Sequence, residues 1–459
     1  MTFRRLVPRS GLWQHRDFLK LWSAETISLF GTQVTFLALP FVAIAILSAS
    51  PFEVALLATV EFLPFILFSL PAGVWVDRLP RRPILIVGDL GRAAALASIP
   101  VAHLAGLLTI YQLYAVAFIN GVLTVFFDVA YMSYLPALVD RDELVEGNAK
   151  LEVSRSSAQI GGPGIGGILI GLVSAPIAVV VDALSFVASA IFIFLIRRRE
   201  PPVKQAAREP TTRSEPMSGM RSEIAVGLRY VFGHRYLRSI AACTATANFF
   251  GNIVFSIFLV YLLRDLELRP ELVGLIFAIG NIGFLVGALV ASRTSARLGV
   301  GPTIVASALL FGPPMLLIPL APRDFPAPLL IASGLFAGLA NVVYNVTQVS
   351  FRQAITPERM QGRMNATMRF IVWGTIPLGQ VLGGVLATTI GLLPTIWIGA
   401  IGSCFAFLPV LLSPVRSLQE MPEPVDDDEP PTAPDTVHPD ADGVIRGPAG
   451  GQLPTPDES

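Results

Sequence analysis

Long apolar runs separated by short polar connectors dominate the pattern of this chain. Each run holds roughly 20 residues with few charges, which is the length at which an α-helix crosses about 30 Å of hydrocarbon. Because a backbone inside lipid must satisfy its own hydrogen bonds, these runs predict helices and an all-α membrane protein. We place twelve transmembrane helices at 21–47, 53–76, 83–106, 110–137, 152–173, 176–196, 239–263, 271–292, 302–321, 327–350, 367–391 and 394–413.

The pattern occurs twice, at an offset of 219 residues. His15 and Phe36 return as His234 and Phe255. After a slip of two residues, three glycines also return: Gly162, Gly166 and Gly167 as Gly379, Gly383 and Gly384. A period this long exceeds the units of soluble solenoids, and a duplicated bundle with a site between its halves is a common transporter architecture. We therefore expect two six-helix bundles.

Charge and composition divide the chain further. A polar linker follows the sixth span, and Ile224–Leu237 has apolar residues at helical spacing between arginines, which predicts an amphipathic helix. After Pro414 the sequence is rich in Pro, Asp and Gly and too poor in apolar residues to order itself. The predicted units are an N-terminal segment 1–20, a bundle 21–196, a linker with an amphipathic helix 197–238, a bundle 239–413 and a disordered tail 414–459.

The basic residues alternate between connectors. Most of the 33 Lys and Arg lie on the side of the N-terminus, whereas Arg264, Arg269 and Arg323 lie on the other side and Arg92 and Arg155 lie within spans. The positive-inside rule then places both termini and the linker in the cytoplasm of a multi-pass plasma-membrane protein. The first span is too long for a cleavable signal and should remain as an anchor.

The overall composition excludes several classes of protein. The chain is 53% hydrophobic and 14% charged, with mean hydropathy +0.64, and its net charge of +0 gives no field for nucleic acid. Neither Cys243 nor Cys404 has metal-ligand spacing, and the four histidines form no metal motif. Since no nucleophile or nucleotide-binding motif occurs either, we expect no enzyme, no catalytic residue, no metal and no cofactor.

A charged motif, Gly73-Val74-Trp75-Val76-Asp77-Arg78-Leu79-Pro80-Arg81-Arg82, joins the second and third spans. It resembles the G-x-x-x-D-R-x-x-R-R/K loop signature of the major facilitator superfamily, with Pro80 where that signature usually has Gly. The resemblance implies the major facilitator fold and a cytoplasmic gate formed by Gly73, Asp77, Arg78, Arg81 and Arg82. An alternative, in which Arg81 and Arg82 only fix the topology, stays open.

Two further segments resemble the drug and siderophore exporter branch of that superfamily, which includes macrolide-efflux and enterobactin-exporter types. One is Asp140-Arg141-Asp142-Glu143-Leu144 with the following Asn148-Ala149, and the other is Gly227-Leu228-Arg229-Tyr230 before the seventh span. In the second half, Ser292 and Ala296 stand at the positions of Gly73 and Asp77. We therefore expect only the first copy of the gate motif to act.

The fifth span carries a glycine motif that is similar to the one associated with proton-driven exporters of the superfamily. Its matching residues are Gly162, Pro163, Gly166 and Gly167. Small residues let helix backbones touch, and proline removes a backbone hydrogen bond and bends the helix. The resemblance implies antiport, while a pure packing role for the glycines stays open.

Ionisable residues at membrane depth are costly, so their default interpretation is functional. They occur only in the first-half spans, as Glu25, Glu61, Asp89, Arg92, Asp128, Arg155 and Asp182. We take Glu61 and Asp128 as the leading proton-coupling candidates, with Asp182 and Glu25 behind them. Glu25 has an alternative as an interfacial residue, and Asp89 with Arg92 has one as an internal ion pair.

The second-half spans hold amides in place of acids: Asn248, Asn252, Asn281, Asn341, Asn345, Gln348 and Gln380. Of these, we expect Asn248, Asn252, Asn281, Asn345 and Gln348 to line the substrate cavity. Aromatic residues such as Phe36, Phe255 and Trp373 are weaker candidates for an apolar wall, because most such residues face lipid or pack.

These features favour a proton-coupled secondary active exporter, an antiporter, of a drug-like or siderophore-like amphiphile that works by alternating access. An importer or uniporter of a small metabolite, or a lipid or lysolipid exporter, stays open on the same fold. We expect a monomer whose partners are the lipid bilayer, the amphiphilic substrate and protons, with the proton gradient as driving force.

Overall fold

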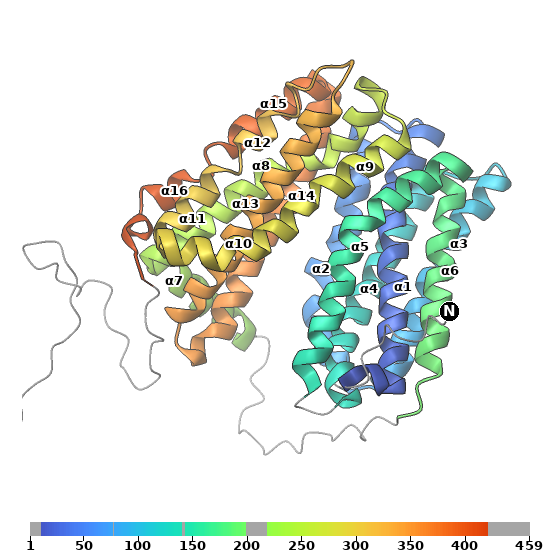
Figure 1. Ribbon diagram of the computed structural model, residues 1–459, viewed down its shortest axis with the longest axis horizontal. Helices are drawn as coiled ribbons and strands as arrows, with labels where there is room; N and C mark the ends of the chain where they lie inside the picture. The colour runs from blue at the N-terminus through green and yellow to red at the C-terminus, as the bar shows by residue number, and fades with distance from the viewer. Residues whose placement is uncertain (1–10, 77, 140–142, 199–217, 421–459) are drawn as a thin grey trace, which may run out of the picture.

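The computed structural model describes residues 11–76, 78–139, 143–198 and 218–420, and all regular secondary structure in these ranges is helical. Within them, 11 helices are long and apolar enough to cross a membrane, and a shorter apolar stretch, Val300–Leu316, occupies the place of the predicted ninth span. The prediction of an all-α membrane fold made of two bundles is confirmed (Figure 1).

The first bundle contains α1 to α6. Side chains that satisfy free backbone N–H groups mark several helix starts. Ser50 and Glu53 form a reciprocal capping box at the start of α2, with Ser50 N donating to Glu53 Oε2 over 2.7 Å. The elements are η1 Gly11–Gln14, α1 Arg16–Phe41, the π-helical turn η2 Val42–Ile46, α2 Pro51–Val76, α3 Arg81–Leu104, α4 Ile110–Leu138, α5 Leu144–Val173 and α6 Ala175–Phe194.

The second bundle departs from the prediction at its ninth span. Instead of one helix over 302–321, the chain forms α11, a turn and the short α12, because Pro313 and Pro314 lack backbone N–H groups. The elements are α8 Arg235–Val260, the π-helical turn η4 Tyr261–Asp265, α9 Pro270–Gly280, α10 Ile282–Leu298, α11 Val300–Leu309, α12 Pro313–Leu316, α13 Ala327–Ala354, α14 Glu358–Ile390, α15 Leu392–Ser403 and α16 Leu408–Leu411.

The predicted amphipathic helix is present as α7, Ser218–Gly233. The next residue, His234, is the N-cap of α8. The helix α7 packs on the second bundle through Val231, which is fully buried, and through Gly227, where a Cβ would meet the backbone of α14 at Arg363 O, 3.2 Å away. The linker side of the molecule is defined here as the end that holds α7, η1 and the connection between α2 and α3.

The predicted disordered tail is wrong for its first residues. η5, Pro414–Ser417, continues into a segment that lies on the start of α11. Gly301 N donates to Leu418 O over 2.8 Å, and Val300 N donates to Gln419 O over 3.2 Å. Backbone hydrogen bonds, which composition does not reveal, order this stretch. The remainder of the predicted tail, 421–459, lies outside the described residues.

The 219-residue repeat is present in the backbone itself. The π-helical turn η2 recurs as η4 at this offset, and both are followed by a non-glycine residue in the left-handed region, Ser48 with φ 51° and Glu267 with φ 49°. Such conformations are rare outside glycine. Their recurrence at matching positions shows that the two bundles are copies of one structure.

The two bundles meet at one end and separate at the other, as their ribbons show in Figure 1. Away from the linker side, one apolar cluster contains residues of both bundles, including Val42, Val54, Leu262 and Val273. There Arg264 also donates to Ala49 O over 2.6 Å, which joins the halves directly. On the linker side, each bundle has its own separate cluster. The structure is therefore sealed on the side opposite the linker.

Candidate functional site: a cavity in one bundle and acids in the other

A cavity of about 640 Å³ lies in the second bundle, among α8, α9, α13 and α14. That volume falls within the range of small-molecule sites. Its described lining contains no acidic or basic side chain and combines amides with aromatic rings. The lining residues that carry this character are Asn248, Asn252, Asn281, Asn341, Asn345, Phe255, Phe258, Phe277, Phe284, Phe311, Tyr344 and Trp373.

Four of the five amides that the sequence assigned to the substrate cavity line it: Asn248, Asn252, Asn281 and Asn345. The fifth, Gln348, is buried behind the wall and donates to Asn345 Oδ1 over 3.0 Å, so it orients a lining residue. Asn252 donates to Asn248 O over 2.8 Å along α8. These bonds restrain the side chains of Asn252 and Asn345 at the cavity wall.

The structure adds Asn341 to the amides that line the cavity. The sequence predicts this residue within an apolar span but does not assign it to the cavity. Asn341 is exposed, lines the cavity, and within the described residues its side chain has no hydrogen-bond partner. An amide without a protein partner can both donate to and accept from a ligand. The spacing of Asn341 and Asn345, one helical turn apart on α13, was the signal that could have found it.

The acids lie in the first bundle, and two of them, Asp89 and Asp182, each have a side-chain partner for one carboxylate oxygen. Arg92 Nη2 bonds Asp89 Oδ1 at 2.5 Å, which confirms the alternative that this pair forms an internal ion pair. The Arg92 guanidinium lies between the rings of Phe127 and Phe186, at 4.2 and 4.1 Å from their centroids. Two aromatic faces and a carboxylate compensate for burying this cation.

Asp182 on α6 is buried and accepts a hydrogen bond of 3.0 Å from Ser185 Oγ. It faces α1 at Gly31, where a Cβ would come within 2.7 Å of the Ser185 side chain. The close packing of α1 on α6 therefore depends on a glycine opposite this acid. Asp182 sits in a closed, packed position.

Glu25 and Asp128 differ from Asp89 and Asp182, because in the described part of the chain neither carboxylate has a hydrogen-bonded or ion-paired partner. Glu25 is only 8% exposed, and its Oε2 atom has no hydrogen-bond partner, so it is not the interfacial residue of the alternative interpretation. Among charged groups, Asp128 acts most strongly on Glu25, followed by the cations Arg92 and Arg155. Asp128 is exposed and is affected by the same two arginines. Glu25 on α1 and Asp128 on α4 therefore interact electrostatically within the first bundle, and we call them the acidic pair.

Glu61 lies apart from that pair. It borders a second, smaller hollow of about 70 Å³ between the bundles, lined by residues of α1, α2, α8 and α9. Phe36 and Phe255, which are repeat copies of each other, stack across this boundary with centroids 6.2 Å apart. The predicted set of proton-coupling residues is thus divided between two places.

The glycine motif lies at a boundary between the bundles. A Cβ at Gly167 would lie 2.9 Å from Gly274 Cα on α9, and Gly274 in turn closely approaches Pro163 O. Gly162 and Gly166 instead pack on α1 at Gln33 and Val34. The repeat copy of the first contact, Gly384 against Ala55, joins α14 to α2. Two helix crossings of the same kind therefore hold the halves together.

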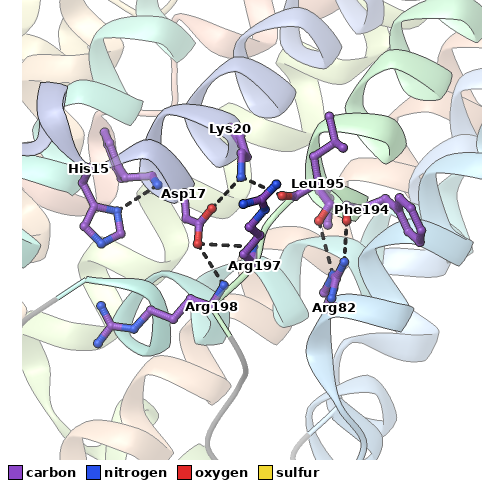
Figure 2. A network of polar contacts seen from close by, with 10 residues as sticks. His15, Asp17, Lys20, Arg82, Phe194, Leu195, Arg197 and Arg198 are labelled. Atoms are coloured by element: carbon purple, nitrogen blue, oxygen red, sulfur yellow. Dashed lines mark hydrogen bonds and ion pairs between the residues drawn. The ribbon is translucent and has the colours of Figure 1, made fainter.

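The gate motif lies on the linker side, and its Asp77 is outside the described residues. Gly73 has open space around it, and Arg78 is exposed. Arg82 donates to the carbonyls of Ile193 and Phe194 at the end of α6, as Figure 2 shows for Phe194. A cation at a helix C-terminus is favourable because the last carbonyls carry partial negative charge.

A polar network continues from this helix end to α1 (Figure 2). Asp17 accepts hydrogen bonds from the backbone N–H groups of Arg197 and Arg198, and Lys20 donates to Leu195 O over 2.6 Å. Arg198 also reaches Leu138 O over 2.8 Å. The described contacts of Arg82 thus stay within the first bundle. Of the neighbouring loop motif, Asp140, Arg141 and Asp142 lie outside the described residues.

The structure is a pair of duplicated helical bundles, with a polar cavity in one and intramembrane acids in the other. The family model that matches the chain is one of the major facilitator superfamily, whose members are membrane transporters and not enzymes. The chain belongs to the transmembrane secretion effector family, whose model matches residues 11–445. Within the described residues, no group of three or more His, Cys, Asp and Glu side chains is placed to hold a metal ion.

Among curated relatives, the multidrug efflux pump Tap of Mycolicibacterium fortuitum is 27% identical over 83% of this chain and 93% of its own length. Macrolide efflux protein A of Streptococcus pyogenes is 22% identical over 87% of this chain and 97% of its own length. A bacterial homologue of the iron transporter ferroportin, solved in an inward-facing state, superposes with TM-score 0.70 and 14% identity, covering 86% of this chain and 98% of that one. This last similarity establishes the fold alone.

Proposed function

We propose that this protein exports amphiphilic small molecules, including drug-like compounds, from the cytoplasm in exchange for protons. The observation that carries the proposal is the separation of roles between the bundles: an amide-lined and aromatic-lined cavity without charge in one, and the Glu25–Asp128 pair in the other. The multidrug and macrolide exporters among its relatives support the direction of transport.

We further propose that the linker side faces the cytoplasm, so that the structure is an inward-open state of a plasma-membrane protein. The excess of Lys and Arg on the linker side supports this orientation. The seal on the opposite side, formed by the shared apolar cluster and the Arg264–Ala49 bond, supports the inward-open state.

Proton coupling follows from the surroundings of the acidic pair. Two carboxylates that share a site are poorly tolerated when both are charged, unless cations or water compensate. In the inward-open state, Arg155 and exposure of Asp128 supply that compensation. Rocking of the bundles that removes water from the pair would favour the protonated form, and reopening would favour release. Protonation then biases which side of the transporter is open.

Reconstitution in inverted vesicles tests the proposal. With tritiated erythromycin or ethidium outside, an inside-acidic gradient should drive uptake into vesicles that contain the protein, and a protonophore should abolish it. Uptake driven by the reverse gradient would indicate an importer, gradient-independent equilibration a uniporter, and transport of labelled lysolipid alone a lipid exporter. Each of these three results would contradict proton-coupled drug export.

A further inference from the structure

The hollow beside Glu61 has a composition distinct from that of the large cavity. Its walls are Phe36, Phe255, Phe258 and Phe277 together with aliphatic side chains and Ser256, and Glu61 is the one charged residue among its described lining. Phe36 and Phe277 meet edge to face at 89°, and Phe258 and Phe277 do so at 74°. Four aromatic rings and one carboxylate therefore line the same hollow at the boundary between the bundles.

Glu61 has no partner of its own in the part of the chain that the structure describes. No ion pair or hydrogen bond joins its carboxylate to a described side chain, and it is partly exposed rather than sealed. This distinguishes it from Asp89, which binds Arg92, and from Asp182, which binds Ser185. An intramembrane carboxylate without a protein partner can pair with a cation from outside the protein.

The hollow and the large cavity share part of their walls. Phe255, Phe258 and Phe277 border both spaces. The repeat copy of Glu61 is Gly280, which borders the large cavity and carries no charge. The two spaces are therefore neighbours, one uncharged and lined by amides and the other lined by a carboxylate and aromatic rings.

We infer that Glu61 and its phenylalanines bind the ammonium group of amphiphilic cations, while the uncharged body of the ligand occupies the amide-lined cavity. A carboxylate supplies the counter-ion, and desolvated aromatic faces attract quaternary or protonated amines. The inference deepens the proposed function, because it names the substrate class and assigns Glu61 to substrate charge, whereas Glu25 and Asp128 carry protons.

Equilibrium binding to the purified full-length protein tests this assignment without any gradient. The probes are tritiated 4-biphenylyl-trimethylammonium and its uncharged isostere 4-tert-butylbiphenyl, which differ in charge but hardly in shape. The wild type should bind the cation roughly tenfold more tightly, the scale of a desolvated cation–π contact or ion pair. Glu61→Gln should remove this preference and leave binding of the neutral isostere within about twofold.

Matched variants separate recognition from folding. Glu61→Asp keeps the charge and should retain part of the preference, whereas Phe36→Leu and Phe255→Leu should weaken the cation selectively. Asp324→Asn should keep the full preference, because Asp324 is exposed and lies outside the hollow. A wild type without preference, or a Glu61→Gln variant that keeps it or loses both probes equally, overturns the inference. Failure of gradient-driven transport in vesicles would instead count against proton exchange and leave this binding result unaffected.

Discussion

The two bundles share one backbone but carry different chemistry. The π-helical turns and the left-handed residues Ser48 and Glu267 match at the 219-residue offset. The first copy nevertheless holds the intramembrane acids, and the second holds the amides around the 640 Å³ cavity. The comparison teaches that duplication supplied a common frame, and under the proposed function the two copies divide proton handling and substrate binding between them.

The largest expected effect comes from removing the acidic pair. Asp128→Asn or Glu25→Gln should reduce gradient-driven transport by about two orders of magnitude or more, the scale of losing a positioned proton carrier. Exchange of labelled for unlabelled substrate without a gradient should continue, because the cavity lies in the other bundle. Parallel uptake and counterflow assays measure both quantities.

Asp324→Asn serves as the control for these acids, since Asp324 is exposed and lies in the connection before α13, in the other bundle. It should leave both assays unchanged. If the Asp128 and Glu25 variants still concentrate substrate against a gradient, the assignment of proton handling to the first bundle is wrong.

A smaller effect is expected at the crossings between bundles. Gly167→Val places a side chain against Gly274 Cα, and overpacking of this kind costs about 1–3 kcal/mol. We expect transport to fall roughly tenfold through loss of one conformer, and Gly384→Ala to act in the same direction at the copy of this contact. Transport rates and thermal unfolding of the purified protein provide the measurement.

Gly374 on α14 offers the matched control, because a Cβ there meets nothing within 4 Å. Gly374→Ala should preserve both transport and stability. Normal transport by Gly167→Val would contradict a role for close backbone contact in the motion.

Substitution in the cavity should change affinity and leave proton coupling intact. Asn341→Leu removes an amide that has no described protein partner, so roughly a fivefold to tenfold rise in KM is expected from the loss of one hydrogen bond to the ligand. The dependence of transport on the pH gradient should stay as in the wild type. A shifted gradient dependence with unchanged KM would reverse the roles assigned to the two bundles.

The smallest effect concerns how each bundle holds its last helix. Arg82→Ala removes hydrogen bonds to the end of α6 and should lower stability by about 1 kcal/mol, since the site is only partly buried. Gly301, at the corresponding position in the repeat, contacts the chain after α16 by backbone alone. Gly301→Ala should therefore destabilise more than Arg82→Ala in a thermal unfolding assay, and the opposite order would contradict the comparison.

Sequence predicted the architecture well because the bilayer leaves few choices for an apolar run of this length. The ninth span was wrong because Gly312-Pro313-Pro314 lies within an apolar stretch that hydropathy alone treats as continuous. The order of residues 414–419 was missed because backbone hydrogen bonds to Val300 and Gly301 hold it, and composition carries no signal for them.

For the site, the sequence identified the polar residues but not the space that each side chain faces. Four of five proposed amides line the cavity, because uncharged polar residues in lipid-spanning helices tend to face the interior. The sequence ranks Glu61 ahead of Glu25, but it does not show which space either side chain faces. Only the packing of α1, α2, α8 and α9 shows that they serve different spaces.

The stacking of Phe36 on Phe255 has a consequence for the origin of the chain. A side chain that touches its own copy lies beside the axis that relates the two halves, as in an isologous homodimer. An ancestral six-helix subunit with this ring would have met a second subunit through the same ring. Once the two subunits were joined into one polypeptide, their sequences no longer had to be identical. Acids could then accumulate in one half and amides in the other.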